Sequence, residues 1–188
     1  MERSFEAVLV EQCATTLAGV KPASLFRYQG ADQRQSREAA ARWAKELAPY
    51  GITVRILKVC PQTGACLIYL YRAGWLRSIL SEPSTRAFLA GQGYGADQSC
   101  QELLRQLSRR LCLEREFPHE IGVFLGYPLE DVVGFIRNRG RNYTCCGCWK
   151  AYGDPEAARR RFDQYRRCTA ACKERFRRGA PITQLIAA

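Results

Sequence analysis

Apolar and polar residues recur along the chain with two different periods, one typical of helices and one of strands. Residues 3–18 and 34–48 carry apolar side chains three and four positions apart, the spacing of an amphipathic helix. Residues 23–28, 52–59 and 66–72 are short runs rich in aromatic and β-branched side chains, which is typical of strands. The pattern predicts a β-α-β-β unit with one helix before it.

The last two of these strands differ in the polarity of their faces. In ITVRILKV, residues 52–59, β-branched and charged side chains alternate, which indicates that one face of the strand is more exposed to solvent. CLIYLYR, residues 66–72, is almost wholly apolar, which predicts a strand covered on both faces. The turn-rich link between them predicts a hairpin. If strands 23–28 and 52–59 run parallel, a right-handed crossover is expected between them.

The chain becomes helical after these strands. Short helices are expected over residues 73–83 and 84–95, where a proline and several glycines interrupt the pattern. Residues 97–113 repeat apolar side chains at helical spacing and predict a longer helix.

The last part of the chain predicts three more helices. Pro118 predicts the start of a helix, because its missing N–H costs nothing in the first turn. His119 would then take the second helical position. Residues 129–140 predict the next one. A loop over 141–154 precedes the final helix, which Asp154 caps and which runs to about residue 178. Only the last few residues of the chain are expected to be loose.

Together these elements predict an α+β fold. Residues 1–72 form a small β-α-β-β sheet covered by helices, and residues 73–188 form a mostly helical half with a basic, cysteine-rich end. A chain of 188 residues is long enough to bury one core, so we expect a single domain over 1–188.

Two features of the composition bear on where the protein acts. No apolar run approaches the ~20 residues that span a bilayer, so no membrane partner is expected. The first residues, MERSFEAVLVEQC, carry three glutamates and no cationic leader, which predicts a cytoplasmic protein without a secretory signal. In a reducing compartment the ten cysteines are expected to be thiols, metal ligands or redox groups.

Positive charge is concentrated near the end of the chain. Between Arg137 and Arg178 there are thirteen Lys or Arg residues and four acidic ones, so +9 of the net charge of +11 lies in this stretch. Such a field favours anionic partners, namely nucleic acid, an acidic redox partner protein, or an anionic small molecule. A solvated helix face is the alternative.

Five of the ten cysteines fall in two groups near this basic end. Cys145 and Cys148 form a C-x-x-C pair in a glycine-bearing loop, and Cys168 and Cys172 are one turn apart on the last helix. These four thiolates could form a site for zinc or an iron–sulfur cluster. Cys146 would be a spare or reactive thiol. Packing of the helical pair in the core is the alternative.

The only histidine lies upstream of this group. At the start of a helix the dipole would favour a neutral imidazole, so His119 is a candidate ligand for a metal or haem, or an acid–base group with Glu120. An enzyme could use His119, Glu120 or Cys146 as catalytic groups. Its anionic substrate or cofactor would bind in a concave site that joins four further residues to the cysteine loop: Tyr127, Arg137, Arg141 and Trp149.

Aromatic and basic residues also alternate around the cysteine loop. Tyr143, Trp149 and Tyr152 interleave with Arg139, Arg141 and Lys150. Such a mixture can stack nucleic-acid bases or wrap the loop, and we favour the second interpretation.

Several strings in the chain are specific to one family. CATTLAGVKPASLF, FPHEIGVFLGYPLEDVVGFIRNRGRNYTCCGCWKAYGD and the helix up to Cys168 resemble the bacterial domain-of-unknown-function family numbered 3793. The resemblance covers almost the whole chain. It implies a soluble single-domain protein found mainly in anaerobic bacteria, associated with iron acquisition and flavodoxins, and it assigns no activity and no residue role.

These observations leave three functions open. The first is an accessory protein of iron or redox metabolism that binds a metal, an iron–sulfur cluster or a haem-like cofactor through clustered thiolates. The second is a basic nucleic-acid-binding module with structural cysteines. The third is an enzyme that acts on an anionic small molecule.

Overall fold

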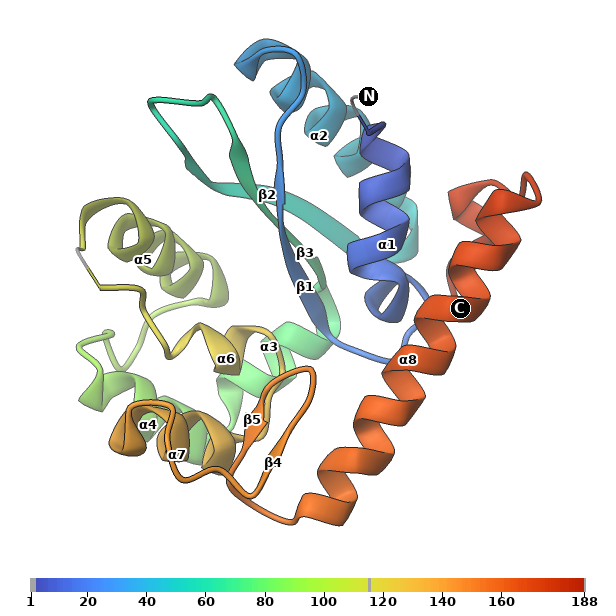
Figure 1. The fold of residues 1–188 in the computed structure, drawn as a ribbon. Helices are drawn as coiled ribbons and strands as arrows, with labels where there is room; N and C mark the ends of the chain where they lie inside the picture. Colours follow the sequence, from blue (N-terminus) through green and yellow to red (C-terminus); the bar gives the residue numbers. More distant parts are fainter. Residues whose placement is uncertain (1–2, 115, 188) are drawn as a thin grey trace. The chain divides into compact units, whose positions relative to one another are not determined.

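The most apolar strand, β3 (Cys66–Arg72), lies in the middle of a three-stranded antiparallel sheet. Its neighbours are β1 (Ala23–Tyr28) and β2 (Ile52–Val59), in the order β1-β3-β2 (Figure 1). The computed structural model describes residues 3–114 and 116–187. The chain divides into two units, which we name the sheet unit, up to Trp75 and again from Arg167, and the helical unit, Leu76–Arg166.

The strand pairing confirms the predicted hairpin. Val54 lies opposite Leu70, and Phe26 on the other side lies opposite Ile68. Because β1 and β2 are each antiparallel to β3, they run parallel to one another with β3 between them. Side chains on both faces of β3 are buried, among them Ile68 and Tyr69, which explains its apolar sequence.

Helices α1 (Phe5–Leu17) and α2 (Gln33–Leu47) lie on one side of this sheet (Figure 1). Their apolar faces share one core with the strands, the sheet-unit part of α8 (Pro155–Arg177) and the 3-10 turn η2 (Ile182–Leu185). A second 3-10 turn, η1 (Ala48–Tyr50), connects α2 to β2.

Arg72 holds the carboxyl end of α1 in place. Its guanidinium donates hydrogen bonds to the backbone oxygens of Thr16 at 2.9 Å, Leu17 at 2.7 Å and Ala187 at 3.0 Å. The oxygens of Thr16 and Leu17 lie at the end of α1, where the last carbonyls of a helix have no intrahelical donor, and that of Leu17 also accepts from the amide of Ala187 at 3.1 Å. Arg72 thus joins the sheet, α1 and the end of the chain.

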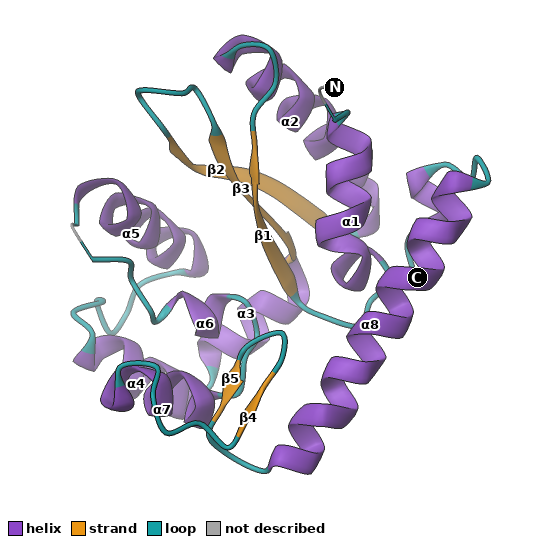
Figure 2. Cartoon of the chain, in the orientation of Figure 1, coloured by secondary structure: helices purple, strands orange, loops and turns teal. Residues whose placement is uncertain are grey.

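The helical unit is built from short helices and one hairpin (Figure 2). Its helices are α3 (Ala73–Ser81, which begins in the sheet unit), α4 (Pro83–Gly91), α5 (Cys100–Leu113), α6 (Ile121–Phe124), α7 (Leu129–Asn138) and the start of α8. The hairpin pairs β4 (Cys145–Cys146) with β5 (Lys150–Ala151). With eight α-helices and two antiparallel sheets among the described residues, the α+β class is confirmed. The single domain stays a prediction.

Two local predictions were wrong. Residues 118–120 form a turn, and the helix after them, α6, is only four residues long, because Gly126 takes a φ of +75° and Pro128 follows. Residues 141–154 were expected to be a loop but contain the β4–β5 hairpin. After α8, Ile182 and Leu185 of η2 are buried in the core of the sheet unit.

Candidate functional site

The β4–β5 hairpin carries the cysteine group at its turn. Cys146 lies opposite Lys150, and the amide of Gly147 donates to the carbonyl of Trp149 at 3.0 Å. A Cβ on Gly147 would lie 2.3 Å from the ring of Phe162, so only glycine fits between the hairpin and α8. The turn therefore holds Cys146 and Cys148 at defined positions.

Asp131 of α7 anchors the hairpin from outside. Its carboxylate accepts hydrogen bonds from the indole of Trp149 at 2.7 Å and from the amides of Tyr152 at 2.6 Å and Gly153 at 3.0 Å. The side chain is buried, and three donors satisfy its oxygens. Asp131 is not among the site residues expected from the sequence. Its signal is weak, since an acidic residue in the first turn of a helix is also common for dipole reasons.

A cavity of about 410 Å³, which we name the aromatic cavity, opens beside the hairpin turn within the helical unit. Phe117, Tyr127, Phe135 and Trp149 supply its aromatic walls. Aliphatic side chains of α6, of the residue after it and of α7 complete them: Ile121, Leu125 and Val132. The polar groups on the walls are few, namely those of His119, Asp131, Cys146, Cys148 and Lys150.

Ring contacts fix one wall of the aromatic cavity. Tyr127 stacks on Trp149 with ring centroids 4.9 Å apart, and Trp149 meets Phe162 edge-on at 4.5 Å. Burial raises the pKa of Tyr127 to about 12, so its phenol stays protonated at neutral pH. The cavity therefore presents a rigid aromatic surface without charge on this side.

His119 lies in the turn before α6 and lines the aromatic cavity. Its ring is 4.9 Å from that of Phe135 and 6.2 Å from that of Phe117. Phe117 is about half exposed, so it lies at the mouth. His119 was expected at the start of a helix, but α6 begins only at Ile121. The expectation that a helix dipole acts on its imidazole was therefore wrong.

Glu120, the predicted partner of His119, takes part in a different cluster. Its carboxylate accepts from the hydroxyl of Tyr94 at 2.9 Å and pairs with Arg110 at 3.0 Å, and it is only 2% exposed. Burial, followed by the neighbouring Glu120 carboxylate, raises the pKa of Tyr94. The cluster joins α5 to the turn before α6.

The other predicted ligand-binding residues divide into two groups. Tyr127 and Trp149 line the aromatic cavity together with the cysteine turn, as the concave-site hypothesis expects. Arg137 and Arg141 are exposed and do not line it. Lys150 is the basic side chain on its wall, where the ammonium donates to the carbonyl of Gly140 at 2.8 Å.

The four cysteines predicted as metal ligands lie in different units. Cys145 and Cys148 belong to the hairpin, whereas Cys168 and Cys172 pack in the core of the sheet unit, where the thiol of Cys168 is 3.9 Å from the carbonyl of Ala14. Within residues 3–114 and 116–187, no three His, Cys, Asp or Glu side chains are grouped so that they could hold a metal ion. A shared tetrathiolate centre stays a prediction.

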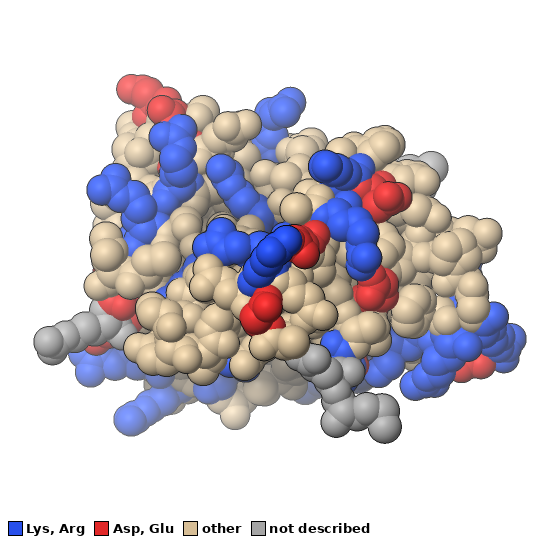
Figure 3. All heavy atoms as spheres, turned by 90° about the horizontal axis from the view of Figure 1, so that it is seen from above, with Lys and Arg blue, Asp and Glu red and all other residues tan. Residues whose placement is uncertain are grey.

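The basic surface contains many local ion pairs. Along α8, Arg160 lies 3.7 Å from Glu156 and Arg166 pairs with Asp163. Directly after its end, Arg178 pairs with Glu174 at 2.8 Å. Figure 3 shows one face of the molecule, on which Lys and Arg side chains predominate over acidic ones. These pairs support the interpretation of a solvated helix face for part of the charge.

No helix in the described part of the chain is long and apolar enough to cross a membrane.

The fold and the site define a class of protein: an α+β chain with a three-stranded antiparallel sheet and a helical unit that holds an aromatic cavity beside a cysteine hairpin. Residues 9–186 match the family described as "Protein of unknown function (DUF3793)", so the chain belongs to this family, as its motifs indicate. Neither the curated proteins nor the solved structures contain a match to the chain.

Proposed function

We propose that the helical unit binds a flat, largely apolar small molecule in the aromatic cavity, against the thiols of Cys146 and Cys148 and the imidazole of His119. One observation carries the proposal: two cysteines and the only histidine of the chain line one apolar cavity of about 410 Å³. Ligand sites commonly measure roughly 300–1,000 Å³ and combine apolar walls with few polar groups.

A haem-like macrocycle is the cofactor whose needs match this set of groups. The macrocycle is flat and apolar, and its iron takes one or two axial ligands from the protein, for which imidazole and thiolate both serve. His119, Cys146 and Cys148 offer such ligands, and the ammonium of Lys150 suits an acidic group on the ring edge. Haem would supply redox or ligand-exchange chemistry at its iron. The proposal therefore keeps iron or redox metabolism as the setting.

Titration of the full-length reduced protein with haemin tests the proposal. We expect a shifted haem absorption band that saturates at one haemin per chain. Phe117→Ala removes an exposed aromatic group at the mouth and should weaken binding about tenfold, which corresponds to about 1.4 kcal/mol. His119→Ala and the double variant Cys146→Ser with Cys148→Ser should change the position of the band, because they remove the candidate axial ligands.

Two comparisons make this titration decisive. Cys112→Ser removes an exposed cysteine on α5 that does not line the cavity, and it should leave the affinity and the band unchanged. Metal-free protoporphyrin should bind more weakly than haemin if the protein supplies an axial ligand. Equal affinities for haemin in the wild type, Phe117→Ala and the double cysteine variant would contradict the proposal.

The same cavity supports a second candidate, an enzyme with a thiolate nucleophile. It is favoured because Cys146 and His119 line one cavity, and imidazole is a common activator of cysteine. Intact-mass measurement after incubation with small thioesters should show one acyl group on Cys146, lost in Cys146→Ser and slowed in His119→Ala. Acylation that is equally fast in His119→Ala would contradict this candidate.

A further inference from the structure

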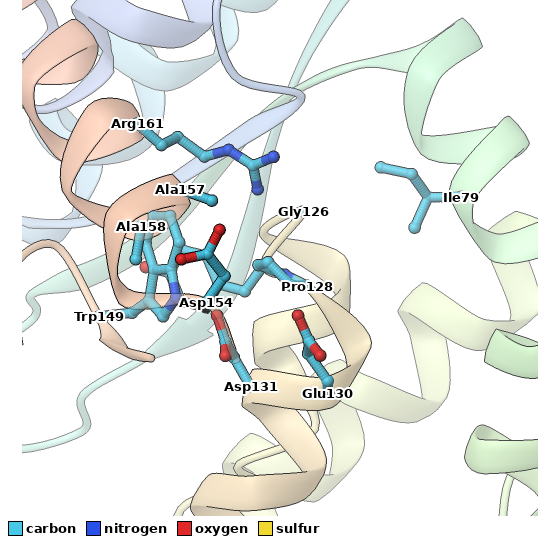
Figure 4. A pocket seen from close by; sticks show the side chains of 11 residues that line it. Ile79, Gly126, Pro128, Glu130, Asp131, Trp149, Asp154, Ala157, Ala158 and Arg161 are labelled. Carbon is cyan, nitrogen blue, oxygen red and sulfur yellow. Dashed lines mark hydrogen bonds between the residues drawn. The ribbon is translucent and has the colours of Figure 1, made fainter. Parts of the chain in front are cut away.

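The helical unit contains a second cavity of about 340 Å³, which we name the charged cavity. Glu130 and Asp131 of α7 line one side of it, and Asp154 and Arg161 come from the start of α8 (Figure 4). Its apolar lining includes Ile79 of α3. Three carboxylates and one guanidinium therefore line this cavity, whereas the aromatic cavity is lined by one carboxylate and one ammonium.

Arg161 is the cation of this cavity. In Figure 4 its guanidinium extends from α8 over the cavity in the direction of Ile79. The preceding residue, Arg160, lies 3.7 Å from Glu156 and 4.0 Å from Asp154, whereas Arg161 makes no ion pair with any carboxylate in residues 3–114 and 116–187. Its charge is thus available to an anionic group in the cavity.

The three carboxylates of the cavity differ in how many hydrogen bonds and ion pairs they already make within the protein. Asp131 is buried and accepts three hydrogen bonds from the hairpin, so it serves as wall. Asp154 caps α8 by accepting from the amide of Glu156 at 2.8 Å. Glu130 is exposed, projects into the cavity in Figure 4, and forms no ion pair among the described residues. Glu130 is therefore the carboxylate best placed for a cationic group.

We propose that the charged cavity binds a small zwitterion of the free α-amino-acid class, with its carboxylate on Arg161 and its ammonium at Glu130. A ligand with one charge of each sign pairs with both groups, which the protein leaves unpaired with each other. A ligand with only one charge would leave the opposite group unpaired in a partly enclosed space. The volume suits a small molecule, and Ile79 offers a surface for an apolar side chain.

This inference goes beyond the function proposed above and rests on different charged groups. The two cavities share three wall residues, Tyr127, Asp131 and Trp149, but Arg161 and Glu130 line only the charged cavity. A failure to bind haemin would therefore not affect the zwitterion site, and the reverse also holds.

Saturation-transfer NMR on the full chain with the standard amino acids at millimolar concentration tests the proposal, followed by calorimetry on the strongest binder. Arg161→Gln and Glu130→Gln should each weaken its binding at least tenfold, since each removes one charge pair. Both side chains are exposed, so we expect the variants to fold, which circular dichroism will check. Arg159→Gln, an exposed arginine of α8 outside the cavity, should bind like the wild type.

Two ligand analogues make the result specific. The amide of the best amino acid lacks the carboxylate, and its deamino analogue lacks the ammonium, and each should bind at least tenfold more weakly than the amino acid. The proposal is overturned if no amino acid binds at 10 mM, taken as about the weakest affinity of interest. Binding of the amide that equals that of the amino acid and persists in Arg161→Gln would instead identify a simple cation site and also overturn it.

Discussion

Two pairs of cysteines close together in the sequence occupy opposite environments. Cys168 and Cys172 lie one turn apart on α8 and pack in the core of the sheet unit, where Cys172 is 5% exposed. Cys146 and Cys148 lie at the turn of the hairpin in the helical unit, are exposed and line the aromatic cavity. Spacing in the sequence pairs Cys168 with Cys172 and Cys148 with Cys145, but the surroundings decide which thiols can meet a ligand.

The pKa values of the cysteines in the core of the sheet unit reflect their burial. Burial, with a contribution from the neighbouring Cys172, raises the pKa of Cys168 to about 11. Burial also raises the pKa of Cys13, which lies in the same core. A thiol must ionise to act as a nucleophile, so these two cysteines are expected to react slowly with electrophiles at neutral pH.

The largest expected difference between the two pairs is in their rate of alkylation. Under native conditions Cys146 and Cys148 should react with iodoacetamide at least about a hundredfold faster than Cys172, because a buried thiol reacts only through opening events. Time-resolved peptide mass spectrometry measures the rates. In urea, where the chain is unfolded, the three cysteines should be alkylated at similar rates. Comparable alkylation rates for Cys172 and Cys148 in the folded protein would contradict the assigned difference in burial.

Removal of the anchor of the hairpin should have the next largest effect. Asp131→Ala leaves the indole N–H of Trp149 and the amides of Tyr152 and Gly153 without their acceptor, so the free energy of unfolding should fall by about 3 kcal/mol. Urea denaturation followed by tryptophan fluorescence measures it.

The matched control for this change is Asp163→Ala. It removes an exposed carboxylate that pairs with Arg166 on α8, and it should change stability by no more than about 0.5 kcal/mol. Similar losses in the two variants would show that Asp131 is not an anchor.

One substitution in each cysteine pair should change the free energy of unfolding by different amounts, a smaller effect than that of Asp131→Ala. Cys172→Ser places a hydroxyl in the core of the sheet unit and should lower the free energy of unfolding by about 2 kcal/mol. Cys148→Ser replaces an exposed thiol and should be neutral within about 0.5 kcal/mol. Chemical denaturation of the two variants side by side measures the difference, and the opposite order would refute the assignment of core and cavity.

The smallest expected effect is the dependence of stability on alkaline pH. The thiol of Cys168 ionises near pH 9 in the unfolded chain and near pH 11 in the folded chain. Between these values the unfolded state loses a proton that the folded state keeps, so the free energy of unfolding falls as pH rises from about 9 to about 11.

Denaturation at several pH values tests this contribution. Cys168→Ala removes the buried thiol and should show a shallower fall over this range than the wild type. Cys148→Ala, in the hairpin turn, is the matched control, and an identical slope in both variants would contradict the assigned effect of burial.

Elements with a long periodic pattern were predictable from the sequence. The three strands of the sheet and the helices α1, α2, α5, α7 and α8 occur close to the expected residues. The β4–β5 hairpin was missed because each of its strands has two residues, too few for alternation to be recognised. It depends on the buried carboxylate of Asp131, which is 14 or more positions away in the chain.

Candidate site residues were predictable by type but not by surroundings. Tyr127, Trp149, Cys146 and His119 meet at one cavity, whereas Glu120 pairs with Arg110 and Tyr94 elsewhere in the helical unit. Charge and aromatic character can be read at each position. Whether two such groups face the same cavity depends on elements that are brought together only by folding.

The sequence by itself determined the kinds of elements, the α+β class and the family, because helical and strand periods and family motifs are properties of contiguous residues. Only the tertiary structure decided the strand order, the burial of Cys168 and Cys172, and the two cavities of the helical unit. The physical reason is that burial and proximity depend on side chains from distant segments, which no local pattern specifies.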